Sequence, residues 1–165
     1  MSANIFLVED EKPIITLLQY NLEKEGYKVN FAETGEEAIQ NIKKNIPDLI
    51  ILDWMLPDFS GIEVCKQIKK INKLKSIPVL MLTAKSEEED KVRGFESGVD
   101  DYVTKPFSYK EILLRVKSLL KRITRRSHGS NKFWQTFNVD SFPKSSNVYV
   151  HCSSFNINFI SPNII

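Results

Sequence analysis

A short apolar run that ends in a carboxylate most constrains the fold of this chain. Residues 49–52 read Leu-Ile-Ile-Leu and are followed at once by Asp53. A continuous apolar run of this length, bounded by turn signals, is typical of a buried parallel strand. Ligands of open α/β sheets bind at the carboxyl ends of such strands, which makes Asp53 a candidate site residue. Because an Asp after a strand also commonly forms a turn or caps a helix, the other strand ends must decide between the two interpretations.

The rest of the chain, up to residue 125, repeats this alternation of strand and helix. Further apolar runs predict strands at 4–8, 28–31, 78–82 and 102–104. Helical patterns follow them, beginning at Pro13 and Thr34 and covering 61–71, 87–96 and 108–125. Five strands alternating with five helices predict right-handed crossovers and a parallel sheet that is covered on both faces.

Two of the helices carry clear local signals. After Pro13, apolar residues recur at helical spacing, at Ile14, Leu17, Leu18 and Leu22. Thr34, with a Glu three residues later, resembles a capping box that starts the second helix.

Polar groups stand at the ends of four of the five predicted strands, namely Glu9-Asp10, Asp53, Thr83-Ala84 and Lys105. A parallel sheet brings these ends to one edge. Carboxylates that lie close together repel and raise one another's pKa unless a cation lies among them. A few oxygen ligands with room for water favour Mg²⁺ over a closed Ca²⁺ cage. Zinc is disfavoured, because the two histidines lie outside the alternating region and no thiolate is near.

This set of residues suits phosphoryl transfer to a carboxylate. With Mg²⁺ held by Asp10 and Asp53, the second Asp53 oxygen can attack a phosphoryl group and form an aspartyl phosphate. The developing charge requires donors, which would be Lys105, Thr83 and the backbone N–H groups of Met55 and Ala84. Each residue also has a structural interpretation as a cap or a solvated charge. Their occurrence together at four strand ends favours a functional site.

The chain resembles the receiver domain of two-component response regulators over residues 1–125. The motifs that carry the resemblance are Val8-Glu9-Asp10-Glu11, Leu52-Asp53-Trp54-Met55-Leu56-Pro57, Leu82-Thr83-Ala84, Gly98-Val99-Asp100-Asp101-Tyr102 and Lys105-Pro106-Phe107. The resemblance implies a flavodoxin-like (βα)₅ fold, doubly wound around a parallel five-stranded sheet. It also implies Mg²⁺ as cofactor, a sensor histidine kinase as phosphoryl donor, and a phospho-accepting regulator rather than a conventional enzyme.

The same resemblance assigns roles to the acidic residues. Asp53 matches the phosphoacceptor, and Glu9 and Asp10 match the metal-binding acidic pair. Asp53 itself and the backbone carbonyl of Met55 are the further metal ligands that the resemblance implies.

The resemblance also implies a switch. Thr83 and Tyr102 match the switch pair, Lys105 matches the phosphate-sensing lysine, and the Lys105–Pro106 bond matches one that is cis in the family. The Thr83 hydroxyl is expected to move towards the phosphoryl group and vacate space, which the Tyr102 ring then enters from an exposed position.

Residues 87–94 and 110–116 are similar to the winged-helix transcription-factor branch of the family, the OmpR/PhoB subfamily. In that branch receivers dimerise through the fourth helix, fifth strand and fifth helix. The expected ion pairs are Lys91 with Glu111, Asp101 with Arg115 and Glu96 with Arg122, around apolar Val92, Phe95 and Leu113. The alternative is a solvated charged helix face, because exposed ion pairs contribute little singly.

The resemblance stops near Arg126, where the composition changes abruptly. Residues 127–165 contain no Leu, Ala, Met or Glu, and their only Lys, Arg, Asp or Glu residues are Lys132, Asp140 and Lys144. No helix pattern and no basic recognition helix of the kind that reads DNA is visible there. We interpret 126–165 as an atypical tail of a truncated or frameshifted gene, with a genuine partner-binding tail as the alternative; residual DNA binding is not expected.

Composition narrows the remaining function classes. A net charge of +2 requires no polyanionic partner, and two distant cysteines favour a reducing compartment. No apolar run approaches the ~20 residues that span a bilayer, so we expect a cytoplasmic protein without membrane contact. Two other functions stay open, a stand-alone receiver that acts as a phosphate sink or interaction switch, and an aspartyl-phosphate phosphatase. The phosphatases of this type have a second carboxylate two residues after the nucleophile, where this chain has Met55.

Overall fold

The structure is a computed structural model that describes residues 2–84 and 98–128, with side chains through residue 122. Five parallel strands form one sheet in the order β2-β1-β3-β4-β5. The strands are β1 (Asn4–Val8), β2 (Lys28–Ala32), β3 (Leu49–Asp53), β4 (Val79–Ala84) and β5 (Asp101–Lys105). The helices in the described ranges are α1 (Lys12–Lys24), α2 (Gly35–Lys44), α3 (Gly61–Lys70) and α5 (Tyr109–His128).

This strand order is that of the flavodoxin-like fold, so the predicted parallel five-stranded architecture is confirmed. The predicted strand 78–82 is longer than expected, since β4 continues to Ala84 and thereby includes Thr83. The predicted helix at 87–96 lies outside the described residues.

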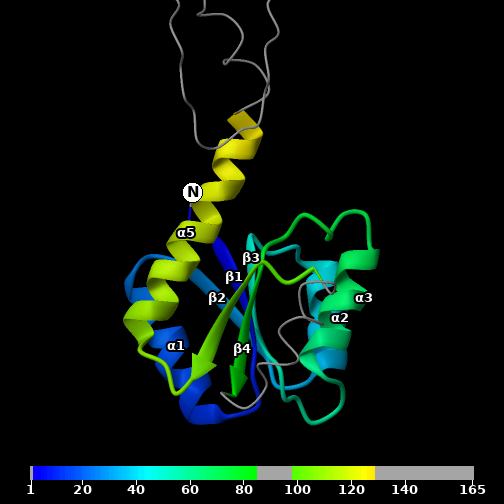
Figure 1. Ribbon diagram of the computed structural model, residues 1–165, viewed down its shortest axis with the longest axis vertical. Helices are drawn as coiled ribbons and strands as arrows, with labels where there is room; N and C mark the ends of the chain where they lie inside the picture. Colours follow the sequence, from blue (N-terminus) through cyan, green and yellow to red (C-terminus); the bar gives the residue numbers. More distant parts are fainter. Residues whose placement is uncertain (1, 85–97, 129–165) are drawn as a thin grey trace, which may run out of the picture. The chain divides into compact units, whose positions relative to one another are not determined.

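Helices cover both faces of the sheet. Figure 1 shows α1 and α5 on one face and α2 and α3 on the other. Strand β3 is buried at every position, because its side chains alternate between two apolar layers. Ile50 and Leu52 face the layer under α2 and α3, while Leu49 and Ile51 face the layer under α1 and α5. The strand that carries Asp53 is therefore the most enclosed part of the sheet.

Helix α1 differs from its predicted apolar face at Leu17, which is exposed, and at Ile15, which is buried although it was not predicted to be. The buried residues are Ile15, Leu18 and Leu22, which are spaced three and four apart on one side of the helix. Leu17 is 43% exposed. Its neighbour Leu18 already occupies the inward direction, so Leu17 turns towards solvent.

Both helices on the other face start at side-chain caps. Thr34 Oγ1 accepts a hydrogen bond from the backbone N–H of Glu37 at 3.2 Å, as the sequence predicts for α2. Ser60 Oγ accepts one from the N–H of Glu63 at 3.3 Å at the start of α3. These caps satisfy backbone donors that a helix leaves unpaired at its first turn.

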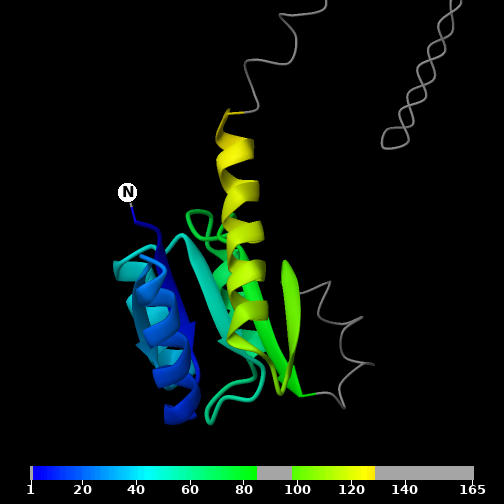
Figure 2. The same ribbon diagram turned by 90° about the vertical axis from the view of Figure 1, so that its left-hand side faces the viewer.

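Helix α5 packs on the sheet through Ile112, Val116 and Leu119. It continues past the end of the strands in both views (Figure 1, Figure 2). Among the helices of the described part, none has the length and apolarity needed to cross a bilayer.

Candidate functional site

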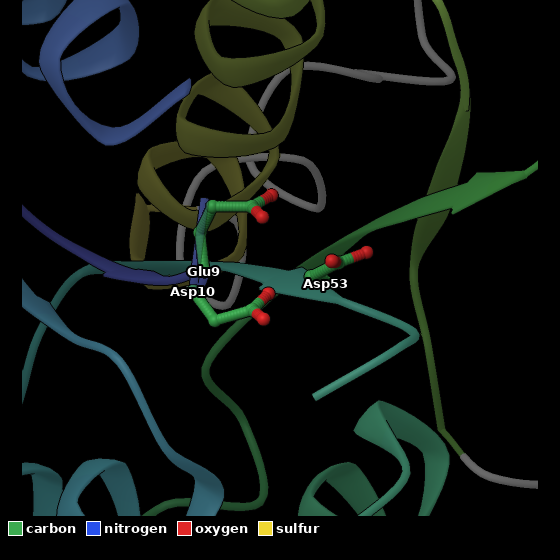
Figure 3. A group of neighbouring side chains, drawn as sticks. All are labelled: Glu9, Asp10 and Asp53. Carbon is green, nitrogen blue, oxygen red and sulfur yellow. The ribbon is translucent and has the colours of Figure 1, made fainter. Parts of the chain in front are cut away.

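Three carboxyl groups meet at the carboxyl end of the sheet, and we call them the acidic edge. Glu9 and Asp10 directly follow β1, and Asp53 is the last residue of its neighbour β3. One carboxylate oxygen from each lies within 4.8 Å of the other two. Figure 3 shows Glu9 and Asp10 extending their carboxyl groups towards the side of Asp53. Glu9 and Asp53 are buried, and Asp10 is exposed.

Lys105, the last residue of β5, places its ammonium group against this edge. Lys105 Nζ lies 3.0 Å from Asp53 Oδ2 and 3.0 Å from Glu9 Oε2. It also lies 3.1 Å from Glu11 Oε1. Glu11 was not among the predicted site residues, because its place just before α1 favours a role at the helix start. Its position directly after the acidic pair was the available signal.

Burial and charge shape the acid–base state of this cluster. Burial, followed by the negative charge of Asp53, raises the pKa of Glu9 to about 7, although Lys105 opposes the shift. For Lys105, burial acts to lower the pKa, but the hydrogen bonds and ion pairs with Asp53 and Glu9 outweigh it and raise the pKa. Lys105 therefore stays protonated at neutral pH. Its single positive charge faces three carboxyl groups, those of Asp53, Glu9 and Glu11.

The acidic edge fits a divalent cation with hard oxygen ligands. Its three carboxyl groups come from two strand ends, and because Asp10 is exposed, water and phosphoryl oxygens can reach a cation held there. A cation there would favour the ionised form of Glu9, whose pKa is otherwise raised. The donor set thus fits Mg²⁺, and the carbonyl of Met55 as a further ligand stays a prediction.

The segment that follows Asp53, residues 54–60, is tied down at its base. The N–H of Trp54 donates to the carbonyl of Leu82 at 2.9 Å, and the N–H of Gly61 donates to the carbonyl of Trp54 at 2.7 Å. A side chain at Gly61 would place its Cβ only 2.1 Å from the backbone oxygen of Asp53. Glycine at 61 therefore lets α3 begin directly against the backbone of Asp53.

Thr83 and Tyr102 lie on the neighbouring strands β4 and β5. Thr83 is buried, and its hydroxyl donates to the carbonyl of Ala84 at 3.2 Å. Tyr102 is half-buried, packs against the apolar layer under α2 and α3, and has an inaccessible phenol oxygen. The expectation that this ring starts from an exposed position is wrong, because alternation along β5 turns it into that layer. The Lys105–Pro106 bond is cis, as the resemblance implies.

The predicted dimer face is only partly within the described residues. Asp101 and Arg115 pair inside the chain, with Arg115 Nη1 at 3.0 Å from Asp101 Oδ1, and Glu111 lies 3.5 Å from Arg115 Nη2. Leu113 is half-buried against the layer under α1 and α5, and Arg122 is exposed. The remaining members lie outside the described residues, namely Lys91, Val92, Phe95 and Glu96.

Comparison with known proteins places these features in a family. Residues 5–117 match the family model of the response regulator receiver domain. The chain is 57% identical over 122 residues to the alkaline phosphatase synthesis transcriptional regulatory protein PhoP of Bacillus subtilis, covering 74% of this chain and 50% of that protein. It is 48% identical over 124 residues to the phosphate regulon transcriptional regulatory protein PhoB of Escherichia coli, covering 75% and 54%. The chain thus spans about half the length of the curated relatives it matches.

Solved structures show the same fold. A putative response regulator from Chloroflexus aurantiacus superposes with a TM-score of 0.70 at 39% identity, covering 73% of this chain and 99% of that one. The chemotaxis protein CheY4 of Vibrio cholerae gives a TM-score of 0.69 at 29% identity, covering 72% and 99%.

Proposed function

The chain belongs to the response regulator receiver domain family, and on this premise we propose that Asp53 accepts a phosphoryl group from a sensor histidine kinase in a Mg²⁺-dependent reaction. The family is that of two-component response regulation, and the relatives are regulators of the PhoB and PhoP type. We assign the receiver domain to residues 1–125 and treat 126–165 as a separate tail.

One observation carries the proposal: the ammonium of Lys105 and the carboxyl groups of Glu9, Asp10 and Asp53 converge at one strand edge. An Asp53 oxygen forms a bond to phosphorus, and the bond from phosphorus to the donor nitrogen breaks, so that the electron pair leaves with the histidine. Glu9, Asp10 and Asp53 would hold the Mg²⁺, which when bound would supply positive charge to the phosphoryl oxygens. Lys105 already lies beside Asp53 Oδ2 and provides a fixed second cation.

Thr83 follows Leu82, the β4 residue that pairs in register with Asp53. In the proposed switch, the Thr83 hydroxyl breaks its hydrogen bond to the carbonyl of Ala84 and donates instead to an oxygen of the new phosphoryl group. The half-buried Tyr102 ring then shifts against the apolar layer under α2 and α3. Because Tyr102 and Asp101 are adjacent in β5, the shift reaches the dimer face that includes Glu111, Leu113, Arg115 and Arg122. Phosphorylation would thereby favour a homodimer.

The surface next to the site suits a protein as phosphoryl donor. An open, mostly apolar depression of about 430 Å³ lies beside Lys105, and its lining residues are Glu11, Ile14, Leu17, Lys105, Pro106 and Phe107. The exposed Leu17 belongs to it. Such an apolar patch beside a reactive carboxylate offers a partner contact area that a small phosphate ester does not need.

The proposal is tested by intact-mass spectrometry after incubation with acetyl phosphate, with and without Mg²⁺. We expect a single Mg²⁺-dependent phosphoryl adduct that is lost in Asp53→Asn. Asp48→Asn is the matched control, because Asp48 lies just before the opposite end of β3 and its carboxylate binds the N–H of Asn4 at 2.7 Å. An adduct that persists in Asp53→Asn would refute the assignment, and so would the absence of any adduct in the parent chain.

A further inference from the structure

Asp58 lies outside the acidic edge but on the same 54–60 segment as Met55. We propose that Asp58 is a positioning residue for the phosphorylation site, because its carboxylate ties this segment to the first turn of α2. The inference rests on the proposed function, because the expected role of Asp58 is to hold the Met55 backbone so that its carbonyl can be a ligand of the bound Mg²⁺.

The contacts of Asp58 join two parts of the chain that are distant in sequence. Its Oδ1 accepts a hydrogen bond from the N–H of Gly35 at 2.9 Å, and its Oδ2 accepts one from the N–H of Glu36 at 2.8 Å. Both donors belong to the first turn of α2, where backbone N–H groups lack helical acceptors and the helix dipole favours an anion. The two bonds are charge-assisted and fix the carboxylate in orientation as well as position.

The ionisation state of Asp58 agrees with this role. Burial acts to raise the pKa of Asp58, but the hydrogen bonds from Gly35 and Glu36 outweigh it and lower the pKa below its ordinary value of 3.8. The carboxylate is therefore fully ionised throughout the neutral range.

The packing around Gly35 makes the junction close. A Cβ at Gly35 would lie 2.5 Å from Val64 Cγ2 on α3 and 3.4 Å from Asp58 Oδ1. The start of α2 therefore rests against both α3 and the segment. With Thr34 capping the same turn through the N–H of Glu37, three successive N–H groups have side-chain acceptors.

Asp58 adds a second link between the 54–60 segment and the rest of the fold. The base of the segment is held by the Trp54 and Gly61 hydrogen bonds and by the antiparallel bridge between Met55 and Ser60. The Trp54 bond ties the start of the segment to β4, and Asp58 ties its far part to α2. Without Asp58 the turn keeps its base but its far part is no longer held to α2, so the Met55 carbonyl would be less well positioned for a cation.

The test measures Mg²⁺ affinity by tryptophan fluorescence in the full chain. All proteins carry Trp134→Phe, so that the signal comes from Trp54, which directly follows Asp53. In Asp58→Ala we expect the Mg²⁺ dissociation constant to rise about tenfold, the lower end of the range for residues that support metal ligands. Asp58→Asn keeps one acceptor and should lie between parent and Ala variant. Asp48→Ala is the control, since it removes a comparable side-chain-to-backbone bond far from the segment.

The rate of phosphorylation by acetyl phosphate distinguishes a positioning role of Asp58 from a general loss of structure in the variant. In Asp58→Ala the rate should fall at limiting Mg²⁺ and return to within about twofold of the parent at saturating Mg²⁺. A Mg²⁺ affinity equal to that of the parent would overturn the inference, and so would an equal loss in Asp48→Ala. If the parent chain itself accepts no phosphoryl group, the proposed function fails instead, so the two failures are distinguishable.

Discussion

Lys105 Nζ lies 3.0 Å from Asp53 Oδ2, although their strands β5 and β3 are separated in the sheet by β4. The long lysine side chain reaches across the end of β4 to the carboxylate. The same ammonium group contacts Glu9, so it is the shared counter-charge of the two buried carboxyl groups. The stability and the chemistry of the site therefore depend on the same contact.

Replacing Lys105 by alanine should make the stability of the fold more sensitive to Mg²⁺. Removing one partner of a buried ion pair costs about 3–5 kcal/mol, and we expect about 2 kcal/mol here because the Lys105 side chain is 20% exposed. Added Mg²⁺ should raise the melting temperature of Lys105→Ala more than that of the parent. Differential scanning calorimetry in EDTA measures the loss of stability, and the same measurement in Mg²⁺ gives the rise in melting temperature. An equal Mg²⁺ effect in the two proteins would contradict the shared counter-charge, and Lys117→Ala, which loses only an exposed pair with Glu25, is the control.

The raised pKa of Glu9 should appear as a pH dependence of stability in Mg²⁺-free protein. The folded chain binds this proton more tightly than the unfolded chain, so between pH 4.5 and about 7 this group makes the free energy of unfolding fall as pH rises. Glu9→Gln should remove that decline. Urea unfolding at a series of pH values in EDTA tests it, and parallel curves for parent and variant would show that Glu9 is not the responsible group.

Gly61→Ala should be among the most disruptive single changes in the described chain. The added Cβ would approach the Asp53 carbonyl oxygen to 2.1 Å, and a backbone atom cannot move aside as a side chain can. We expect a loss of about 2–4 kcal/mol, in the range of severe steric strain. The comparison is Gly35→Ala, where the nearest atom is the Val64 side chain, and chemical denaturation of both reports the difference. An equal loss of unfolding free energy in the two variants would mean that the backbone of the 54–60 segment can shift to make room for the added Cβ.

Arg115→Ala separates the internal role of this residue from an intermolecular one. Its pair with Asp101 is partly exposed, so the free energy of unfolding of the monomer should fall by less than about 1 kcal/mol. Self-association of the phosphorylated chain should weaken severalfold, as measured by sedimentation equilibrium. An unchanged association constant would remove Arg115 from the dimer face.

Much of the fold was predictable because its signals are local. Four of the five apolar runs end in a polar or charged residue. Thr34 with Glu37 marks a helix start that the structure reproduces. The positions of Asp53 and Lys105 follow from the parallel topology alone, since every strand end reaches the same edge.

The remaining features depend on contacts that no periodicity encodes. Asp58 caps a helix that begins 23 residues earlier in the chain. Lys69 binds Asp100 at 3.1 Å across 31 residues. The outward position of Leu17 and the half-buried position of Tyr102 depend on which of two adjacent side chains faces the core, and apolar periodicity alone does not decide this.

The strand order also has a consequence for how the chain folds. Every pair of neighbouring strands is parallel, so the two strands of each pair are joined by a crossover; β1 and β3, for example, pair Ile5 with Leu49. The strands therefore pair only after long segments of chain have closed into loops. The acidic edge takes Glu9 from the beginning of the domain and meets Lys105 from near its end. The cluster is therefore complete only when β1, β3, β4 and β5 have taken their places side by side in the sheet. A partly folded chain in which these four strands are not yet paired would therefore lack the site that we propose for phosphorylation.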